Sequence, residues 1–248
     1  MTDSEKDNSQ FRFSWSFLAP SERASLAWRD DFVSTFLERD IPTLGLGIPG
    51  AALRRFWTML AHFHGQLWNA AEFARSLGNS EPTARRYLDV LAGAFVARAL
   101  APWFENIGKR QVKAPKVYIR DSGLLHALLG IPGPRDLERH PKVGASWEGF
   151  AIETVLARLR ARPGEAYFWR THTGAELDLL VVRGGQRLGF EIKYTDAPRV
   201  TPSMRIAIED LHLKRLDVLH AGEHTFPLAS RIRAVALGDV PRVVARLR

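Results

Sequence analysis

The sequence contains no cysteine among its 248 residues. Disulfide bonds, thiol nucleophiles and cysteine-ligated zinc or iron–sulfur sites are therefore excluded, so any metal must be held by oxygen or histidine ligands. No apolar run approaches the roughly 18 residues that a membrane-spanning helix needs, and the polar opening lacks the layout of a signal peptide. We therefore expect a cytoplasmic protein with no membrane contact.

The phosphate-binding motif GxxxxGK[ST] is also absent, and the short Gly45-Leu46-Gly47 segment is too short to surround phosphate groups. This chain is therefore not expected to bind or hydrolyse ATP. Ser122 and Ser146 have no evident histidine and acid partners in the sequence, so we predict no hydrolase triad.

The charge balance is mildly basic. Lysine and arginine total 35 against 27 acidic residues, which gives a formal net charge of +8 and a pI near 10.2. A positive excess favours polyanionic partners such as DNA through the summed electrostatic field. The bases concentrate between Arg98 and Arg120, where six bases accompany the single acid Glu105 and several aromatic residues.

Composition and chain breakers separate two N-terminal segments. Residues 1–10 are polar and are predicted to be a disordered lead, whereas residues 11–50 are predicted to be helical and to end in a Pro/Gly-rich linker. Trp28, Phe32 and Phe36 recur every four residues, which places them on one helical face. This apolar face predicts packing on the next domain, a contact with a protein partner, or self-association.

Residues 51–130 show three helical patterns followed by two strand patterns. The second helix is expected to begin at Asn69 and the third at Ser80, because both residues are good N-caps. The strands are predicted at 95–100 and 116–120. Three short helices followed by a basic β-hairpin is the order of a winged helix-turn-helix domain, which commonly binds DNA.

In such a domain the third helix would be the recognition helix, and bases on it and on the hairpin would contact phosphates. The candidate nucleic-acid-binding residues are Arg85, Arg86, Lys109, Arg110, Lys113 and Lys116. Because the third helix also carries Glu81 and Asp89, a winged helix that docks on a protein fits the sequence about equally well.

Residues 131–248 alternate helix and strand patterns in the order α-β-β-β-α-β. The predicted segments are a helix at 145–160, strands at 166–170, 176–182 and 187–194, a helix at 203–211, strands at 215–220 and 232–237, and a last helix that begins at Asp239.

Four charged residues in this region are candidates for chemistry. Side chains alternate along a strand, so Glu191 and Lys193 share one face, and a tight Gly-Gly turn brings Asp178 of the preceding strand beside Glu191. Two close carboxylates repel each other unless a cation lies between them, and Mg²⁺ is the natural choice. Lys193 would stabilise charge on an attacked phosphate, and Glu148 would supply a further ligand.

This arrangement, with Glu148 on a helix, then Asp178, and then Glu191-x-Lys193 on a later strand, resembles the PD-(D/E)xK nuclease superfamily. The resemblance implies that these four residues occupy the metal and catalytic positions. Taken alone, a Glu-x-Lys pair on a strand is more often a surface ion pair.

A longer resemblance extends over about residues 50–225. The segments HGQLWNAAEFARSLGNSEPTARRYLDVL, HPKVGASWEGFAIE, FWRTHTGAELDLLV and GFEIKY are similar to the C-terminal domain of unknown function, number 4143, of bacterial and archaeal AAA-type ATPases. Residues 11–45 resemble the tail of the ATPase module that precedes this domain. The ATP-binding module itself is missing from the sequence.

We therefore predict an α/β protein in which a winged helix-turn-helix domain at 51–130 precedes a restriction-endonuclease-like module at 131–248. Its predicted function is DNA binding, with Mg²⁺-dependent cleavage of DNA as a candidate activity. The alternative is a non-catalytic regulatory or adaptor module from a truncated ATPase-family protein, which binds DNA or a protein. A degenerate gene fragment is a third hypothesis, and it predicts poor solubility.

Overall fold

The structure is a computed structural model that describes residues 19–43, 47–105, 108 and 110–245. The predicted disordered lead at 1–10 and the candidate Lys109 lie outside the described residues. The chain divides into two compact units, the first formed by Met1–Ala99 with Val117–Gly149 and the second by Leu100–Lys116 with Phe150–Arg248. In the described part of the chain, no helix is both long and apolar enough to cross a membrane.

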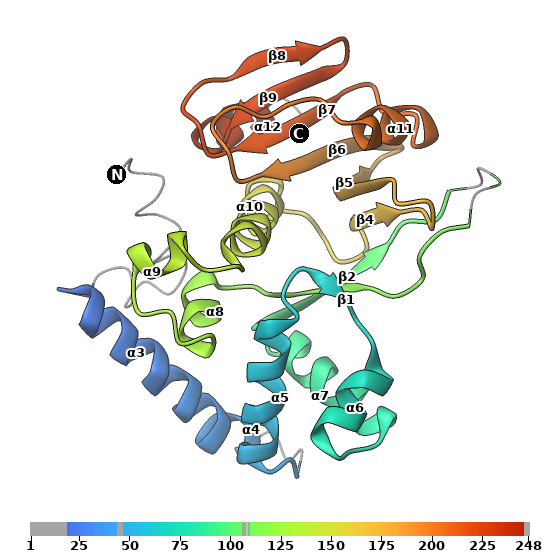
Figure 1. Ribbon diagram of the computed structural model, residues 1–248. Helices are drawn as coiled ribbons and strands as arrows, with labels where there is room; N and C mark the ends of the chain where they lie inside the picture. The colour runs from blue at the N-terminus through green and yellow to red at the C-terminus, as the bar shows by residue number, and fades with distance from the viewer. Residues whose placement is uncertain (1–18, 44–46, 106–107, 109, 246–248) are drawn as a thin grey trace. The chain divides into compact units, whose positions relative to one another are not determined.

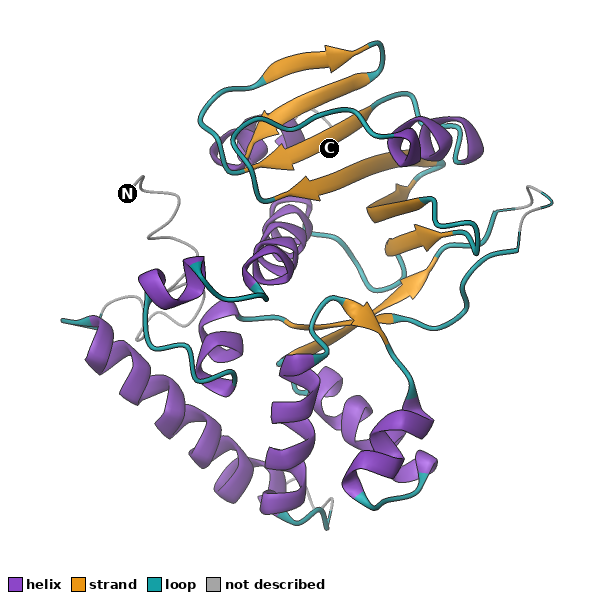
Figure 2. Ribbon diagram, in the orientation of Figure 1, coloured by secondary structure: helices purple, strands orange, loops and turns teal. Residues whose placement is uncertain are grey.

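The first unit is mainly helical (Figures 1 and 2). A π-helical turn, Phe36–Asp40, connects its first two helices. The α-helices are α3 (Glu22–Thr35), α4 (Ile41–Thr43), α5 (Gly50–His62), α6 (Ala70–Leu77), α7 (Glu81–Gly93), α8 (Ser122–Leu128) and α9 (Pro134–Glu138).

Local capping explains where the two central helices begin and end. The Asn69 side chain accepts a hydrogen bond from the backbone N–H of Glu72 at the start of α6, and Ser80 accepts one from Thr83 at the start of α7. Gly78 ends α6 in the left-handed conformation with φ of 65°, which a residue with a Cβ adopts only with strain. The predicted starts of both helices are confirmed.

The aromatic face that begins on α3 is buried at its Phe36 end, in the π-helical turn. Phe36 is buried and packs edge-on against Trp57 of α5, with ring centroids 5.3 Å apart, and Phe32 stacks between Phe36 and Trp28. Packing within the unit therefore accounts for Phe36, whereas Trp28 and Phe32 are only partly buried, and the contact of this face with a partner stays a prediction. The same contacts explain why residues before and after the predicted boundary at 50/51 share one core.

Three short strands accompany these helices: β1 (Gln66–Leu67), β2 (Ala97–Pro102) and β3 (Lys116–Ile119), with β3 between the other two. Gly65 N–H donates to the Val117 carbonyl at 2.8 Å, and Arg120 N–H donates to the Val96 carbonyl at 3.1 Å. The order helix, strand, helix, helix, strand, strand thus runs from α5 to β3.

The second unit contains a mixed sheet. Helix α10 (Val143–Leu159) begins in the first unit and ends in the second. It is followed by β4 (Ala166–Arg170), β5 (Glu176–Arg183), β6 (Gln186–Lys193), α11 (Pro202–Asp210), β7 (Leu216–His220), β8 (Phe226–Ala229), β9 (Ile232–Ala236), a 3₁₀ turn (Leu237–Asp239) and α12 (Val240–Ala245). The predicted order α-β-β-β-α-β is confirmed, and β8 is an additional strand that we did not predict.

Strands β4, β5 and β6 are antiparallel neighbours, whereas β7 runs parallel to β6 and to β9. Helix α11 packs on one face of this sheet through an apolar cluster that includes Met204, Ala207 and Ile208. Their partners on the strands include Leu180 and Val218, which are fully buried. The chain is thus a mixed α/β protein with a helical N-terminal part.

The segment between β2 and β3 belongs to the second unit, although we predicted it as the turn of a hairpin in the first. Its backbone is hydrogen-bonded along β4: Trp103 N–H donates to the Phe168 carbonyl at 2.7 Å, and Val112 N–H donates to the Arg170 carbonyl at 3.0 Å. An ion pair of 2.7 Å between Glu105 and Arg187 adds a side-chain contact. These contacts join the described parts of the segment to the second unit.

Candidate functional site

The β5–β6 hairpin positions the predicted acidic residues. Gly184 and Gly185 form its two-residue turn and both have positive φ, 54° and 76°, as such tight turns require. Leu179 lies opposite Phe190 in the ladder, so Asp178 occurs at the next position toward the open end of the hairpin. The two strands therefore place Asp178 close in register to Glu191, as predicted.

Asp178 lies where β5 changes its register against β4, at an irregularity opposite the stretch between Tyr167 and Trp169. Such bulges re-aim side chains and are common beside active sites. Asp178 is buried, and its Oδ2 accepts a hydrogen bond of 2.8 Å from the backbone N–H of Ile192. Its carboxylate is thus held against the backbone of Ile192, the residue of β6 between Glu191 and Lys193.

Glu191 and Lys193 form an ion pair with 2.7 Å between Oε1 and Nζ. Glu191 is buried, whereas the Lys193 side chain is 40% exposed. A partly exposed ammonium next to a buried carboxylate can meet an incoming anion while it remains attached to the strand. The predicted pairing of these two residues on one face is confirmed by this contact.

A second lysine in this region was predicted for another role. Lys116 is 4% exposed, pairs with Glu176, and has its Nζ 3.8 Å from Asp178 Oδ1. A buried, paired ammonium does not present its charge to an external phosphate, so the prediction that Lys116 contacts nucleic acid is wrong. The sequence signal that could have indicated this pairing is the Glu176-x-Asp178 spacing, since both acids occur two residues apart in a strand.

Glu148 lies on the part of α10 that belongs to the first unit, where Tyr118 donates a hydrogen bond of 2.5 Å to its Oε1. The second unit therefore contains three of the four predicted catalytic residues, and Glu148 is not among them. Glu153, on the same helix, is buried within the second unit. In the described residues, no group of three or more histidine or acidic side chains is arranged to hold a metal ion.

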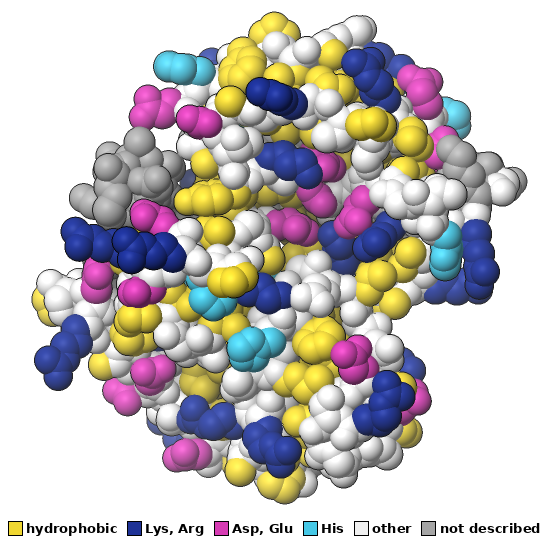
Figure 3. All heavy atoms as spheres, in the orientation of Figure 1, with side chains coloured by type: hydrophobic (Ala, Val, Ile, Leu, Met, Phe, Trp, Pro, Cys, Tyr) yellow, Lys and Arg dark blue, Asp and Glu magenta, His cyan; other side chains and the backbone are white. Residues whose placement is uncertain are grey.

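The predicted nucleic-acid-binding residues occur in both units. Arg85 and Arg86 are exposed on α7, on the face opposite the buried Ala84 and Leu88, and Arg85 pairs with Glu81 at 3.5 Å. Arg110 and Lys113 are exposed in the second unit. Figure 3 shows lysine and arginine side chains spread over the surface with acidic side chains between them.

Two buried histidines of the first unit are held neutral. Burial lowers the pKa of His64 to about 3, and its ring bridges the Ala145 carbonyl and the Ile119 N–H, both at 3.0 Å. Burial also lowers the pKa of His126 to about 3, and its Nε2 lies 2.8 Å from Ser146 Oγ. Gly149 leaves room for the first ring, because a Cβ there would lie 2.5 Å from His64 Nε2. These rings therefore act as neutral packing elements.

Fold and site together define a mixed α/β protein with a helical N-terminal part and a C-terminal unit that carries an acidic pair and a lysine on one hairpin. Residues 143–240 match the model of the family described as Domain of unknown function (DUF4143). The resemblance that we predicted over about residues 50–225 is thus confirmed for residues 143–240. Residues 15–135 match a second model, Domain of unknown function (DUF8612), which spans our predicted boundary at 50/51.

Uncharacterized proteins of Mycobacterium tuberculosis and Mycobacterium bovis are each 54% identical to this chain over 239 residues. The match covers 94% of this chain and 54% of each relative, so the chain spans about half the length of these relatives.

Two crystal structures are distantly similar. One is of the transcriptional regulator PA3341, with 23% identity, a TM-score of 0.24, and coverage of 54% of this chain and 93% of that one. The other is of protein VC1899 from Vibrio cholerae, with 12% identity, a TM-score of 0.31, and coverage of 100% of this chain and 56% of that one.

Proposed function

We propose that this protein binds DNA through its first unit. The observation that carries the proposal is the pair of consecutive exposed arginines, Arg85 and Arg86, on α7, the third helix in an order typical of a winged helix-turn-helix. The strand order β1-β3-β2 agrees with that fold. Arginine is well suited to this role because its planar guanidinium can donate two hydrogen bonds to one phosphate.

Replacing both arginines, in Arg85→Ala/Arg86→Ala, is expected to weaken binding of a duplex oligonucleotide about tenfold at moderate salt. The slope of log affinity against log salt should fall by about 2, since each phosphate contact contributes about 0.9 to it. Fluorescence anisotropy at several salt concentrations measures both quantities.

The matched control is Arg54→Ala/Arg55→Ala, which removes two consecutive exposed arginines from α5. This variant should keep the salt slope of the wild-type protein. Equal losses in both double variants would show that α7 has no special role, and no binding by the wild-type protein would overturn the proposal.

Cleavage of DNA is a second candidate function, and the contacts of Asp178, Glu191 and Lys193 favour it. Asp178 and Glu191 offer carboxylate oxygens, the donors that suit Mg²⁺, from neighbouring strands of one unit. Mg²⁺, when bound there, would supply Lewis acidity at a phosphate. The half-exposed ammonium of Lys193 would bind and orient the phosphodiester, and Glu191 would hold that ammonium in place.

Plasmid nicking by the purified protein with Mg²⁺ tests this activity. Asp178→Asn keeps an acceptor for the Ile192 N–H but removes the charge, so this variant should fold and cleave at least 100-fold more slowly. Lys193→Ala should do the same. DNA binding that survives in both variants, with no cleavage of single-stranded, duplex or branched DNA by the wild-type protein, would instead establish a non-catalytic adaptor.

A further inference from the structure

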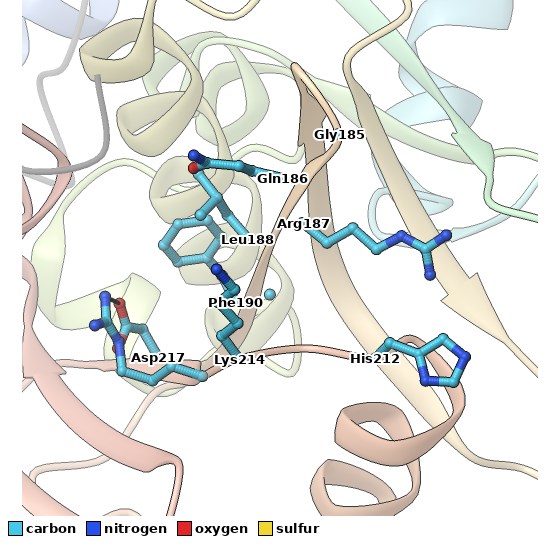
Figure 4. A pocket seen from close by; sticks show the side chains of 10 residues that line it. Gly185, Gln186, Arg187, Leu188, Phe190, His212, Lys214 and Asp217 are labelled. Carbon is cyan, nitrogen blue, oxygen red and sulfur yellow. Dashed lines mark hydrogen bonds and ion pairs between the residues drawn. The ribbon is translucent and has the colours of Figure 1, made fainter.

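The second unit contains a cavity of about 500 Å³ at the turn end of β6 (Figure 4). The predicted catalytic residues Glu191 and Lys193 lie at the other end of this strand. The cavity is formed where β6 extends beyond β7: the pairing of these strands begins at Gly189 opposite Leu216. One wall is therefore the first half of β6, from Gln186 to Phe190, and the other is the loop from His212 to Arg215. Its volume lies in the range typical of small-molecule sites.

Positive charge dominates this cavity. Arg187, Lys214 and Arg215 line it together with a single acidic residue, Asp217. Asp217 is buried and is neutralised by both Arg215 and Arg233, with ion-pair distances of 2.9 Å and 3.0 Å. The acid therefore does not offset the positive charge of the lining.

The charge surplus can be counted from these pairs. Arg215 and Arg233 against Asp217 leave one positive charge, and Arg187 is balanced by Glu105. Lys214 is exposed and, within the described part of the chain, forms no ion pair, so it adds a second positive charge. These side chains together therefore leave a net charge of +2 around the cavity.

The remaining lining combines apolar Leu188 and Phe190 with polar Gln186 and His212. Leu188 and Phe190 lie beside Lys214, whose side chain runs from the loop toward β6 (Figure 4). Arg187 projects from the other face of β6, on the side of His212 (Figure 4), where its guanidinium donates to the Leu211 carbonyl at 3.0 Å and lies 5.5 Å from the Trp103 ring centroid. Fixed charge next to apolar surface suits a ligand with an anionic group and an organic body.

We propose that this cavity binds a phosphate monoester. Such a group carries a charge of about −1.5 to −2 at pH 7, which matches the surplus, whereas a phosphodiester carries only one negative charge. Lys214 and Arg215 would hold the phosphate, and Leu188 would contact the organic part. The ligand is either a free phosphorylated metabolite of nucleotide size or the terminal phosphate of a nucleic acid, and the inference does not depend on the proposed DNA binding or cleavage.

Isothermal titration calorimetry of the full chain tests the proposal with AMP, adenosine and inorganic phosphate as probes. AMP should bind, and adenosine, which lacks the phosphate, should bind at least tenfold more weakly. Lys214→Glu should weaken AMP binding at least tenfold. The matched control is Arg205→Glu, which reverses the charge of an exposed residue on α11 outside the cavity and should bind AMP like the wild-type protein.

Oligonucleotides with a 5′-phosphate or a 5′-hydroxyl separate the two sources. A preference for the 5′-phosphate that disappears in Lys214→Glu identifies a nucleic-acid end as the ligand, and binding of AMP without that preference identifies a free phosphorylated molecule. Either result supports a phosphate monoester site. The proposal is overturned if neither AMP nor the 5′-phosphorylated oligonucleotide binds better than its unphosphorylated counterpart, or if Lys214→Glu and Arg205→Glu bind equally well.

Discussion

Lowering the pH from 7 to 5 is expected to reduce the free energy of unfolding of the first unit by about 4 kcal/mol, because two buried histidines resist protonation. Burial lowers the pKa of both His64 and His126 from 6.5 to about 3. Below pH 6.5 the unfolded chain takes up protons that the folded chain does not. The stability that both histidines provide is therefore complete above pH 6.5 and is lost as the pH falls toward 3.

Calorimetric unfolding of the full chain at several pH values measures this loss. His64→Gln should halve the pH dependence, because a glutamine amide can replace the contacts with the Ile119 N–H and the Ala145 carbonyl without titrating. Adding His126→Gln should remove most of the remainder. His172→Gln, which changes an exposed histidine, is the control and should keep the full dependence. Equal stability of the wild-type protein at pH 7 and pH 5 would contradict this account.

Lys116→Met is expected to destabilise the second unit by about 3 kcal/mol, the cost of breaking a buried ion pair by removing one partner. The substitution puts an apolar side chain in place of the ammonium that contacts both Glu176 and Asp178. Arg170, 3.5 Å from Glu176, compensates in part. Denaturant unfolding followed by tryptophan fluorescence measures the change.

A double variant separates the ion pair from simple packing. Glu176→Gln should restore part of the stability lost in Lys116→Met, because it removes the uncompensated carboxylate. Lys113→Met, at an exposed lysine in the same segment, should change stability by less than about 0.5 kcal/mol. If Lys116→Met and Lys113→Met were equally stable, Lys116 would not be the buried partner that the structure describes.

Local sequence signals were sufficient for most of the secondary structure. The caps at Asn69 and Ser80 and the Gly184-Gly185 turn act through the backbone of their immediate neighbours, so their effects can be read without the fold. Strand β4 has the predicted bounds. Strand β8 was missed because its four residues, Phe226–Ala229, include a proline and do not alternate clearly between apolar and polar side chains.

The candidate site was only partly predictable. The Glu191-x-Lys193 pairing follows from strand alternation, and the short hairpin explains why Asp178 comes close to it. The cavity at Lys214 could not be predicted, because it depends on how far β6 extends beyond β7, which no local pattern records. Its walls come from two segments that are separated by a helix.

The sequence by itself determined most of the order of helices and strands, the absence of cysteine chemistry, and the carboxylates and lysine on the central hairpin, because each depends on residues near one another in the chain. Only the tertiary structure decided that Lys116 is buried beside Glu176 rather than exposed to phosphate. The same holds for Phe36, which packs on Trp57. Burial and ion pairing join residues far apart in the chain, and a lysine is almost always exposed unless such a distant partner pairs with it, so no local pattern predicts its burial.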